Sequence, residues 1–291
     1  MTPDPRWGLP VPAPAKLNLF LHVLGRRADG YHDIQTLFQL LDYGDELVFR
    51  PREDDAILRI SGPTGVAQED DLAVRAARLL RRAADCRQGA EIGISKRIPM
   101  GGGLGGGSSD AATTLLALNA LWGLGLSRTD LATLGAELGA DVPVFVLGRS
   151  AWGEGVGTQL TPVELPRRAY AVIKPPCDVP TAVVFQAPEL TRNSPPMTIS
   201  GFLSSGGRND CLDVVRRRFP AVGVALAWLG RFGEARLTGT GACVYAAFDE
   251  LADAQAAVAA LPTGYLGFAA RGLDRSPLLG PCWSDQEGRP R

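Results

Sequence analysis

The chain lacks several features that would assign it to a special class of protein. Its 291 residues contain no apolar run of roughly 18 residues, the length that a membrane-spanning helix needs. The five cysteines are scattered and never spaced as Cys-x-x-Cys, which fits reduced thiols in the cytoplasm and argues against a disulfide framework or a zinc site. No His/Asp/Glu cluster supports another metal site, and the formal net charge of −1 gives no field that would attract nucleic acid. We therefore expect a cytoplasmic protein without membrane or nucleic-acid partners.

The length of the chain and one glycine-rich segment predict two domains. A chain of 291 residues is longer than a single hydrophobic core usually supports, and the glycine-rich break at 152–157 is the natural boundary. We expect domains at 1–157 and 158–291. The proline-rich start lacks the apolar core of a signal peptide, so we expect disorder over 1–11 and, for similar reasons, over 276–291.

The most informative segment that is present is a run of glycines, Pro-Met-Gly-Gly-Gly-Leu-Gly-Gly-Gly-Ser-Ser-Asp over 99–110. The isoleucines of 91–98 fall at every second position, which predicts a half-buried strand with Lys96 on the isoleucine face. The Ala/Leu-rich segment 111–122 predicts a helix, with Ser108 or Ser109 as its N-cap. Glycines let the backbone approach a ligand closely, and a helix start offers free N–H groups. The unit therefore predicts a cradle for an anion, best a phosphate.

Three interpretations of the glycine run compete. A flexible linker is disfavoured because a strand and a capped helix flank the run directly. A dinucleotide fingerprint would use Gly101, Gly103 and Gly106, but a second strand ending in an acidic residue should follow, and 130–138 reads as another helix. A kinase phosphate loop outside the P-loop class remains, because no Gly-x-x-x-x-Gly-Lys-[Ser/Thr] occurs in the chain.

The rest of the chain mixes strands and helices without regular βαβ alternation, which predicts an α+β fold. Arginine clusters at 81–82 and 216–218 are interpreted as solvated helix faces. We expect strands at 16–24, 169–174 and within 236–248, two apolar stretches within 35–49, a short new element after 141, and helices at 71–84, 210–219, 222–229 and 250–260.

Three segments together resemble the GHMP family of small-molecule kinases. The glycine run resembles the second motif of that family, and Leu-Thr-Gly-Thr-Gly-Ala-Cys at 237–243 resembles the third. Pro-Ala-Lys-Leu-Asn-Leu at 14–19, with Arg-Ala-Asp-Gly-Tyr-His at 27–32, is similar to the branch that phosphorylates 4-diphosphocytidyl-2-C-methyl-D-erythritol. The resemblance implies a two-domain GHMP kinase fold. It would pair an N-terminal ribosomal-protein-S5-like ATP-binding domain with a C-terminal α/β sandwich domain for the substrate.

The resemblance also implies ligands and site residues. ATP with Mg²⁺ would be the donor, and 4-diphosphocytidyl-2-C-methyl-D-erythritol the small-molecule acceptor. The residues implied for ATP are Asp71, Leu72, Lys96, Pro99, Met100, Gly101, Gly102, Gly103, Leu104, Gly105, Gly106, Gly107, Ser108 and Ser109. Those implied for the acceptor are Asn18, Tyr31, His32, Thr181, Phe185, Thr238, Gly239, Thr240 and Gly241, with the base between aromatic faces.

Transfer to an alcohol benefits from a base near the hydroxyl and a cation near the developing charge. The resemblance implies Asp141 and Lys16 for these catalytic roles. From the residues alone, Asp141 could equally be a helix N-cap ahead of Pro143, and Lys16 a snorkelling edge-strand lysine.

The chain departs from the family pattern at a few positions. Asp71 stands where asparagine is usual, and a carboxylate cannot donate the hydrogen bond of an amide to adenine. Gly102 replaces a usual alanine, and Thr238 and Thr240 replace serines but keep their hydroxyls. Two alternatives stay open: a sibling kinase for another small alcohol such as mevalonate or homoserine, and an inactive nucleotide- or RNA-binding protein on the same fold.

Overall fold

The computed structural model describes residues 4–280 and residue 283. The strands are β1 (Pro10–Arg26), β2 (His32–Arg52), β3 (Ile57–Ser61), β4 (Gly89–Ser95), β5 (Ala151–Glu154), β6 (Gln159–Pro162), β7 (Ala169–Lys174), β8 (Ala235–Leu237), β9 (Val244–Phe248) and β10 (Leu266–Leu273). The helices are α1 (Leu72–Ala83), α2 (Gly106–Leu121), α3 (Arg128–Leu138), α4 (Val142–Leu147), α5 (Thr181–Phe185), α6 (Ile199–Ser205), α7 (Leu212–Arg218), α8 (Pro220–Leu229) and α9 (Leu251–Ala259). Short 3₁₀ turns lie at Gln68–Asp70 and Pro277–Leu279.

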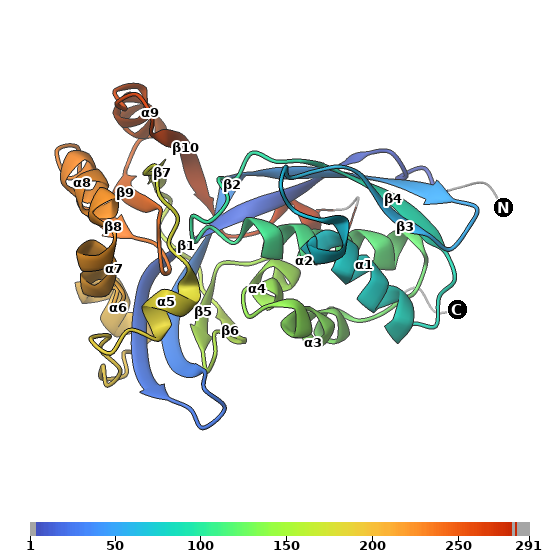
Figure 1. Cartoon of the computed structure of the whole chain (residues 1–291), viewed down its shortest axis with the longest axis horizontal. Coiled ribbons are helices and arrows are strands. Elements are labelled where there is room, and N and C mark those ends of the chain that lie inside the picture. Colours follow the sequence, from blue (N-terminus) through green and yellow to red (C-terminus); the bar gives the residue numbers. More distant parts are fainter. Residues whose placement is uncertain (1–3, 281–282, 284–291) are drawn as a thin grey trace.

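The strands join into one sheet of order β3-β4-β2-β10-β7-β9-β8, with β1 and β5 also pairing with β2. The pairs are antiparallel except β3 with β4. Strands β1 and β2 form a long hairpin whose last pair is Arg26 with His32, so the turn at 27–31 lies at its tip. Figure 1 shows this hairpin running the length of the molecule, with α1 to α4 near one end and α7 to α9 near the other.

Helix α2 is the central helix of the N-terminal part. Nearly all of its residues from Ser109 to Leu121 are buried, both the alanines and leucines and a few polar residues. It packs against β1, α1 and α4. Helix α1 is amphipathic instead: it buries alanine, valine and leucine, while Arg75 and Arg82 are exposed. The beginning of α2 is thereby held rigidly beside β1, which carries Lys16 and Asn18.

Two large apolar clusters form the core, and β1 contributes to both. Val11 and Ala13 belong to the cluster built around α1, α2 and α4. Leu21 and Val23, farther along the same strand, belong to the cluster with β7, β9 and α7. The domain boundary at 157 stays a prediction.

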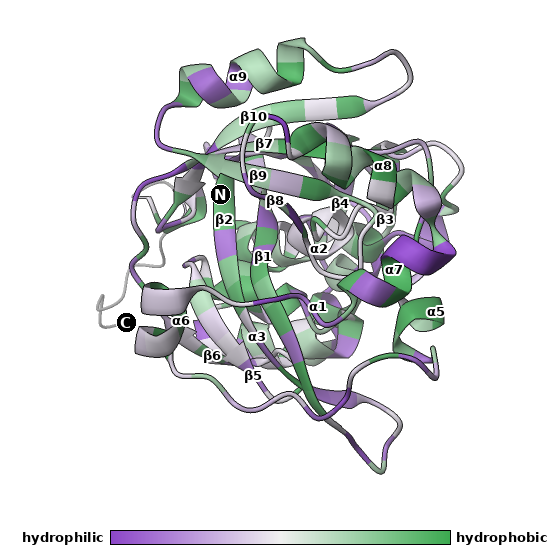
Figure 2. Cartoon of the chain, turned by 90° about the vertical axis from the view of Figure 1, so that its left-hand side faces the viewer, coloured by the Kyte–Doolittle hydropathy of each residue, from purple (hydrophilic) through white to green (hydrophobic). Residues whose placement is uncertain are grey.

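Figure 2 shows strongly hydrophilic colour on α7, whose residues Arg216, Arg217 and Arg218 are exposed.

Several sequence-based expectations need correction. Helix α2 begins at Gly106, not at 111, and its N-cap is Gly105 rather than Ser108 or Ser109. Gly105 has φ +74°, so it makes the turn into the helix from inside the glycine run. The segment 35–49 belongs to one continuous strand, β2. Asp42 is exposed on it, whereas the buried Asp45 accepts hydrogen bonds from Lys96 and from the backbone N–H groups of Arg97 and Ile98. The expectations missed β3, β5, β6, β10, α5 and α6, which are short or interrupted by glycine.

The expected terminal disorder is wrong for part of each tail. Strand β1 already begins at Pro10, and Val11 is fully buried. Near the other end, Leu278 and Trp283 are buried in the same apolar cluster as Val11. Apolar anchors among the prolines and polar residues explain this order. The expectation for 1–3, 281–282 and 284–291 lies outside the described residues. Within the described residues, no helix has the length and apolar character to cross a membrane.

Candidate active site

Lys16 and Asp141, both singled out from the sequence, face each other in the structure. Lys16 Nζ lies 3.1 Å from Asp141 Oδ2. The ammonium also donates to Asn18 Oδ1 at 2.6 Å and to the carbonyl of Gly103 at 3.1 Å. The Lys16 side chain is 3% exposed and the Asp141 side chain 35%. A buried cation with three oxygen partners is therefore held beside a carboxylate that a ligand can reach.

The local structure at Asp141 leaves its carboxylate free for this contact. Asp141 occupies the N-cap position of α4, with Pro143 in the first turn, as the N-cap interpretation expects. Its side chain makes no capping hydrogen bond, however. The short helix thus fixes the backbone of Asp141 while the carboxylate turns toward Lys16.

The glycine run forms a tight loop against the turn at 237–243. Gly101, Gly103 and Gly105 all have positive φ, between +66° and +74°. A Cβ on Gly103 would lie 2.8 Å from the carbonyl oxygen of Thr238, so only glycine fits there. The backbone N–H of Cys243 donates to the carbonyl of Gly102 at 3.1 Å. The glycine run and the turn at 237–243 therefore pack together into one compact wall.

A cavity of about 300 Å³ lies over this loop. It is lined by Asp71, Leu72, Lys96, Pro99, Met100, Gly101, Gly102, Gly103, Leu104, Gly105, Gly106 and Gly107, all expected at the ATP site, and also by Pro63, Val66, Asp70, Ile98 and Asp110. Ser108 and Ser109 are placed differently. Ser108 lines the neighbouring cavity, and Ser109 is fully buried with no partner for its hydroxyl.

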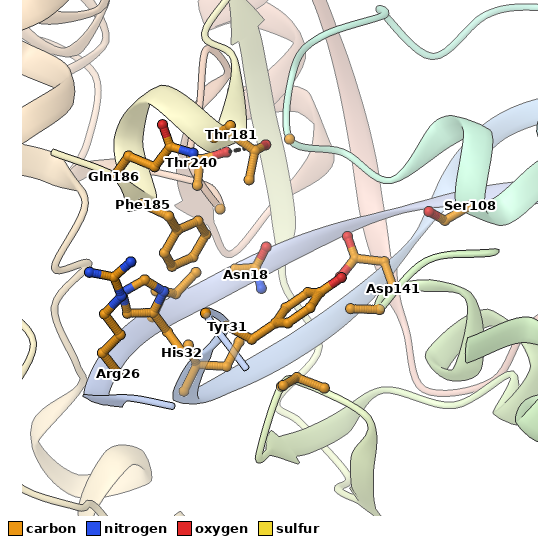
Figure 3. A pocket seen from close by; sticks show the side chains of 18 of the residues that line it. Asn18, Arg26, Tyr31, His32, Ser108, Asp141, Thr181, Phe185, Gln186 and Thr240 are labelled. Atoms are coloured by element: carbon orange, nitrogen blue, oxygen red, sulfur yellow. Dashed lines mark hydrogen bonds between the residues drawn. The ribbon is translucent and has the colours of Figure 1, made fainter. Parts of the chain in front are cut away.

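The larger cavity, of about 810 Å³, is shown in Figure 3. Of the residues expected to bind the acceptor, Asn18, Tyr31, His32, Thr181, Phe185, Gly239 and Thr240 line it, together with Lys16 and Asp141. Thr238 and Gly241 do not line it. Thr238 lies behind the wall, where its Oγ1 accepts from the backbone N–H of Asn18 at 2.9 Å. Gly103 lines both cavities, so they meet beside Lys16 and Asp141.

The two ends of the larger cavity differ in chemistry. Figure 3 shows His32, Phe185 and Arg26 at one end, and Asp141 and Ser108 at the other. The rings of His32 and Phe185 are stacked, with centroids 5.1 Å apart. Burial, together with the charges of Arg192 and Arg26, lowers the pKa of His32. Tyr31 at the hairpin tip is 66% exposed, so one aromatic face is open to a ligand. The aromatic end is therefore suited to a flat base.

Polar pairs line the middle of the larger cavity. Thr181 and Thr240 share a hydrogen bond of 3.0 Å between their hydroxyls. Asn18 donates through Nδ2 to Thr36 Oγ1 at 2.8 Å, which fixes its amide so that Oδ1 faces Lys16. These residues offer hydroxyl and amide groups between the aromatic end and the Lys16–Asp141 pair.

A second lysine, Lys96, is held between two carboxylates below the glycine loop. Its Nζ donates to Asp45 and, at 2.7 Å, to Asp110 Oδ2. Burial raises the pKa of Asp110 to about 7 against the opposing charge of Lys96. The pKa of Lys96 is raised too, because the charges of Asp110 and Asp45 outweigh its burial. The ammonium is thus paired with two carboxylates within the protein, at the edge of the smaller cavity that Lys96 lines.

Asp71 is likewise engaged within the protein. Its Oδ1 accepts from the backbone N–H of Ala73 at 2.9 Å and so caps α1. Its Oδ2 accepts from Arg59 Nη1 at 2.6 Å. Asp71 therefore lines the smaller cavity without a free carboxylate oxygen in this arrangement.

Sequence reasoning missed two kinds of residue. Arg26 and Gln186 line the larger cavity directly. Arg59 and Arg192 act through a neighbour: Arg59 donates to Asp71, and Arg192 donates to His32. Arginines are common in this chain, and no local pattern marks these three. In the sequence, only the glycine run and the Tyr-His pair indicated where the two cavities would lie. Among the described residues there is no group of three or more His, Cys, Asp or Glu side chains that could hold a metal ion by itself.

Comparison with known proteins agrees with this geometry. Residues 71–149 match the model of the GHMP kinases N terminal domain, and residues 190–266 match that of the GHMP kinases C terminal. The chain is 56% identical to a 4-diphosphocytidyl-2-C-methyl-D-erythritol kinase of Alkalilimnicola ehrlichii over 98% of both chains. It is 57% identical to one of Halorhodospira halophila, over 92% of this chain and 94% of that one.

Solved structures give the same result. A crystal structure of 4-(cytidine 5'-diphospho)-2C-methyl-D-erythritol kinase superposes with a TM-score of 0.81 at 34% identity, covering 91% of this chain and 99% of that one. A mevalonate kinase of Methanococcus jannaschii superposes at 0.67 with 15% identity, over 93% of this chain and 100% of that one, which shows the fold alone. The two-domain α+β GHMP architecture is confirmed. With 56% identity to a curated relative over almost its whole length, the chain belongs to the 4-diphosphocytidyl-2-C-methyl-D-erythritol kinase family of GHMP kinases.

Proposed function

We propose that this chain transfers the γ-phosphoryl group of ATP to the 2-hydroxyl of 4-diphosphocytidyl-2-C-methyl-D-erythritol, a step of the non-mevalonate route to isoprenoid precursors. The observation that carries the proposal is the Lys16–Asp141 ion pair, which lies where the two cavities meet. The smaller cavity takes the nucleotide over the glycine loop. The larger one takes the acceptor, with its base at the aromatic end. We place the enzyme in the cytoplasm.

In the proposed reaction, Asp141 is the base. It accepts the proton of the acceptor hydroxyl as the hydroxyl oxygen bonds to the γ-phosphorus. The bond from that phosphorus to the bridging oxygen breaks, and ADP leaves with the electron pair. Lys16 pairs with Asp141 and offsets the negative charge that develops on the transferring group. Asn18 and Gly103 fix the ammonium for this role through their hydrogen bonds.

The glycine loop and the start of α2 supply the phosphate site. Backbone N–H groups at the first turn of a helix, together with its dipole, favour a polyphosphate. Mg²⁺ bound to ATP would neutralise part of the phosphate charge and is held mainly by phosphate oxygens. Asp110 Oδ1 is a buried carboxylate oxygen without a partner, Asp110 lines the smaller cavity, and its chemistry fits a hard cation. We therefore propose Asp110 as its protein ligand.

An ATP-consumption assay against small alcohols tests the proposal. The panel contains 4-diphosphocytidyl-2-C-methyl-D-erythritol, 2-C-methyl-D-erythritol 4-phosphate, mevalonate and homoserine, each with Mg²⁺ and ATP. We expect turnover with the first compound and almost none with the others. Preferred turnover of mevalonate or homoserine would favour a sibling kinase. Binding of ATP without turnover of any alcohol would favour an inactive nucleotide-binding protein.

A further inference from the structure

Arg192 connects the two sides of the aromatic end of the larger cavity. Its Nε donates to His32 Nε2 at 3.1 Å. Its Nη2 donates to the backbone carbonyls of Phe185 at 2.9 Å and Ala187 at 2.7 Å, and Nη1 donates to that of Leu190 at 3.1 Å. One guanidinium therefore holds the histidine of the β1–β2 hairpin against the segment that carries the stacked Phe185.

The chemistry of this contact fixes the protonation of His32. A guanidinium can only donate, so the ring nitrogen that faces Arg192 must be the unprotonated acceptor. In a neutral imidazole the proton is then on the other nitrogen, Nδ1. No described residue accepts a hydrogen bond from Nδ1, although His32 lines the cavity. The ring therefore has a donor left for a ligand at the aromatic end.

We propose that Arg192 is a positioning residue for base recognition: it holds His32 as the Nδ1–H tautomer, stacked on Phe185, so that the site favours cytosine over uracil. The inference rests on the proposed function, because it assumes that the base of the acceptor binds at this end. Arg192 itself does not line the cavity and acts only through His32 and the backbone of 185–190.

The two bases differ where a fixed donor discriminates. Ring nitrogen N3 of cytosine is an acceptor, whereas N3 of uracil carries a proton and can only donate. The Nδ1–H group of His32 can donate a hydrogen bond to N3 of cytosine, whereas against N3–H of uracil two donors would face each other. The Nε2–H tautomer would present an acceptor instead and reverse the preference. A site built around one hydrogen bond rejects an analogue that leaves a buried partner unpaired.

The tautomer can be measured without any substrate. The chain contains only two histidines, so ¹⁵N spectra of the imidazoles show two spin systems, and His22→Gln assigns them. We expect His32 in the wild-type protein to be unprotonated at Nε2 and protonated at Nδ1. In Arg192→Ala the signal should move toward the Nε2–H tautomer. In Arg218→Gln, which removes an arginine bound to Glu189 of the same segment, it should not move.

Binding of two nucleotides tests the consequence. Calorimetry with cytidine 5′-diphosphate and uridine 5′-diphosphate should give a preference for cytidine of at least about tenfold in the wild-type protein and in Arg218→Gln. In Arg192→Ala it should fall below about threefold, with the affinity for ATP unchanged. Arg192→Lys provides a second variant if the alanine variant folds poorly. It keeps a cation, but one ammonium cannot hold His32 and three carbonyls, so the preference should again fall.

The outcomes separate this inference from the proposed function. A wild-type preference for cytidine that Arg192→Ala and Arg192→Lys retain, with the Nδ1–H signal unchanged, overturns the role of Arg192 and leaves the acceptor assignment intact. Equal affinity of the wild-type protein for both diphosphates overturns the acceptor assignment and this inference together. Loss of preference in both Arg192 variants, with the shifted imidazole signal, supports both.

Discussion

Arg59 Nη1 donates to Asp71 Oδ2 at 2.6 Å, and both side chains are largely buried, at 14% and 6% exposure. This pair explains how the chain carries aspartate where the family pattern has asparagine. The carboxylate caps α1 with one oxygen and neutralises Arg59 with the other. The departure at Asp71 is therefore accompanied by a counter-charge that only the folded chain brings near.

The first prediction concerns this pair. Asp71→Asn keeps an oxygen for the cap but leaves the Arg59 guanidinium buried without its anion, so the free energy of unfolding should fall by about 1–3 kcal/mol. Because the carboxylate is already engaged, KM for ATP should change little. Urea denaturation and steady-state kinetics measure the two effects. The matched control is Asp70→Asn, an exposed neighbour, which should leave stability unchanged. A large rise in KM for ATP in a fully stable Asp71→Asn protein would contradict this account.

Local sequence patterns predicted the elements whose signals are local. Strand β7 matches its expected range because 169–173 is an uninterrupted apolar run that Lys174 ends. The start of α2 was placed five residues late because glycines normally argue against a helix, and here the surrounding packing overrides that tendency. Strand β10 was missed because two glycines interrupt Leu266–Leu273, and its pairing with β7 and β2 is what makes it a strand.

The candidate site divides in the same way. Motif residues such as Lys16, Gly103 and Asp141 could be placed from the sequence because the family resemblance names them. Residues that hold the motif side chains, such as Arg59 and Arg192, could not, since their partners lie far away in the chain or on another element. Arg192 meets His32 across 160 residues of sequence.

The second prediction concerns catalysis. Asp141→Asn removes the proton acceptor, and Lys16→Ala removes the cation that is paired with it and that offsets charge on the transferring group. Each should lower kcat by at least about 100-fold. ATP should still bind, because neither side chain lines the smaller cavity. Stopped assays of ADP release and calorimetry with ATP measure the two properties. Near-full turnover by either variant would remove that residue from the proposed mechanism.

The third prediction concerns the phosphate loop. A Cβ on Gly105 would lie 2.8 Å from the ring of Phe145 and 3.2 Å from Lys16 Cε, at a φ of +74°. Gly105→Val should therefore abolish ATP binding and displace Lys16, while the protein stays folded. Gly123→Val is the control, because Gly123 has a φ of +66° but no neighbour within 4 Å of a Cβ. It carries similar backbone strain without the clash, so ATP should bind normally. Unchanged ATP affinity in folded Gly105→Val would refute the cradle.

The fourth prediction concerns pH. His22 is 4% exposed, and burial lowers its pKa below 6.5. The unfolded chain therefore takes up a proton first as the pH falls. The contribution of His22 to the free energy of unfolding is fully present above pH 6.5. It should decrease as the pH falls through 6.5 toward the pKa of His22 in the folded protein. His22→Leu should reduce this loss. Unfolding free energies of both proteins between pH 7.5 and about 5 provide the measurement, and parallel curves would exclude His22 as the source.

The last prediction concerns the base of the acceptor. Phe185 is half-buried and stacked on His32, so packing alone could explain it. If a base also stacks at this end, Phe185→Ala removes about 1–3 kcal/mol of binding, which is roughly a 5- to 150-fold rise in KM for the acceptor. KM for ATP should stay nearly constant.

Binding energy from a remote part of a substrate can also orient the reacting end, so 2-C-methyl-D-erythritol 4-phosphate, which lacks the cytidine, should be a very poor acceptor. Phe232→Ala, which removes an aromatic ring packed on Trp228 outside the cavity, is the control and should change neither KM. Equal kcat/KM for acceptors with and without the cytidine group would exclude base recognition here, and the sibling-kinase alternative would then explain the site better.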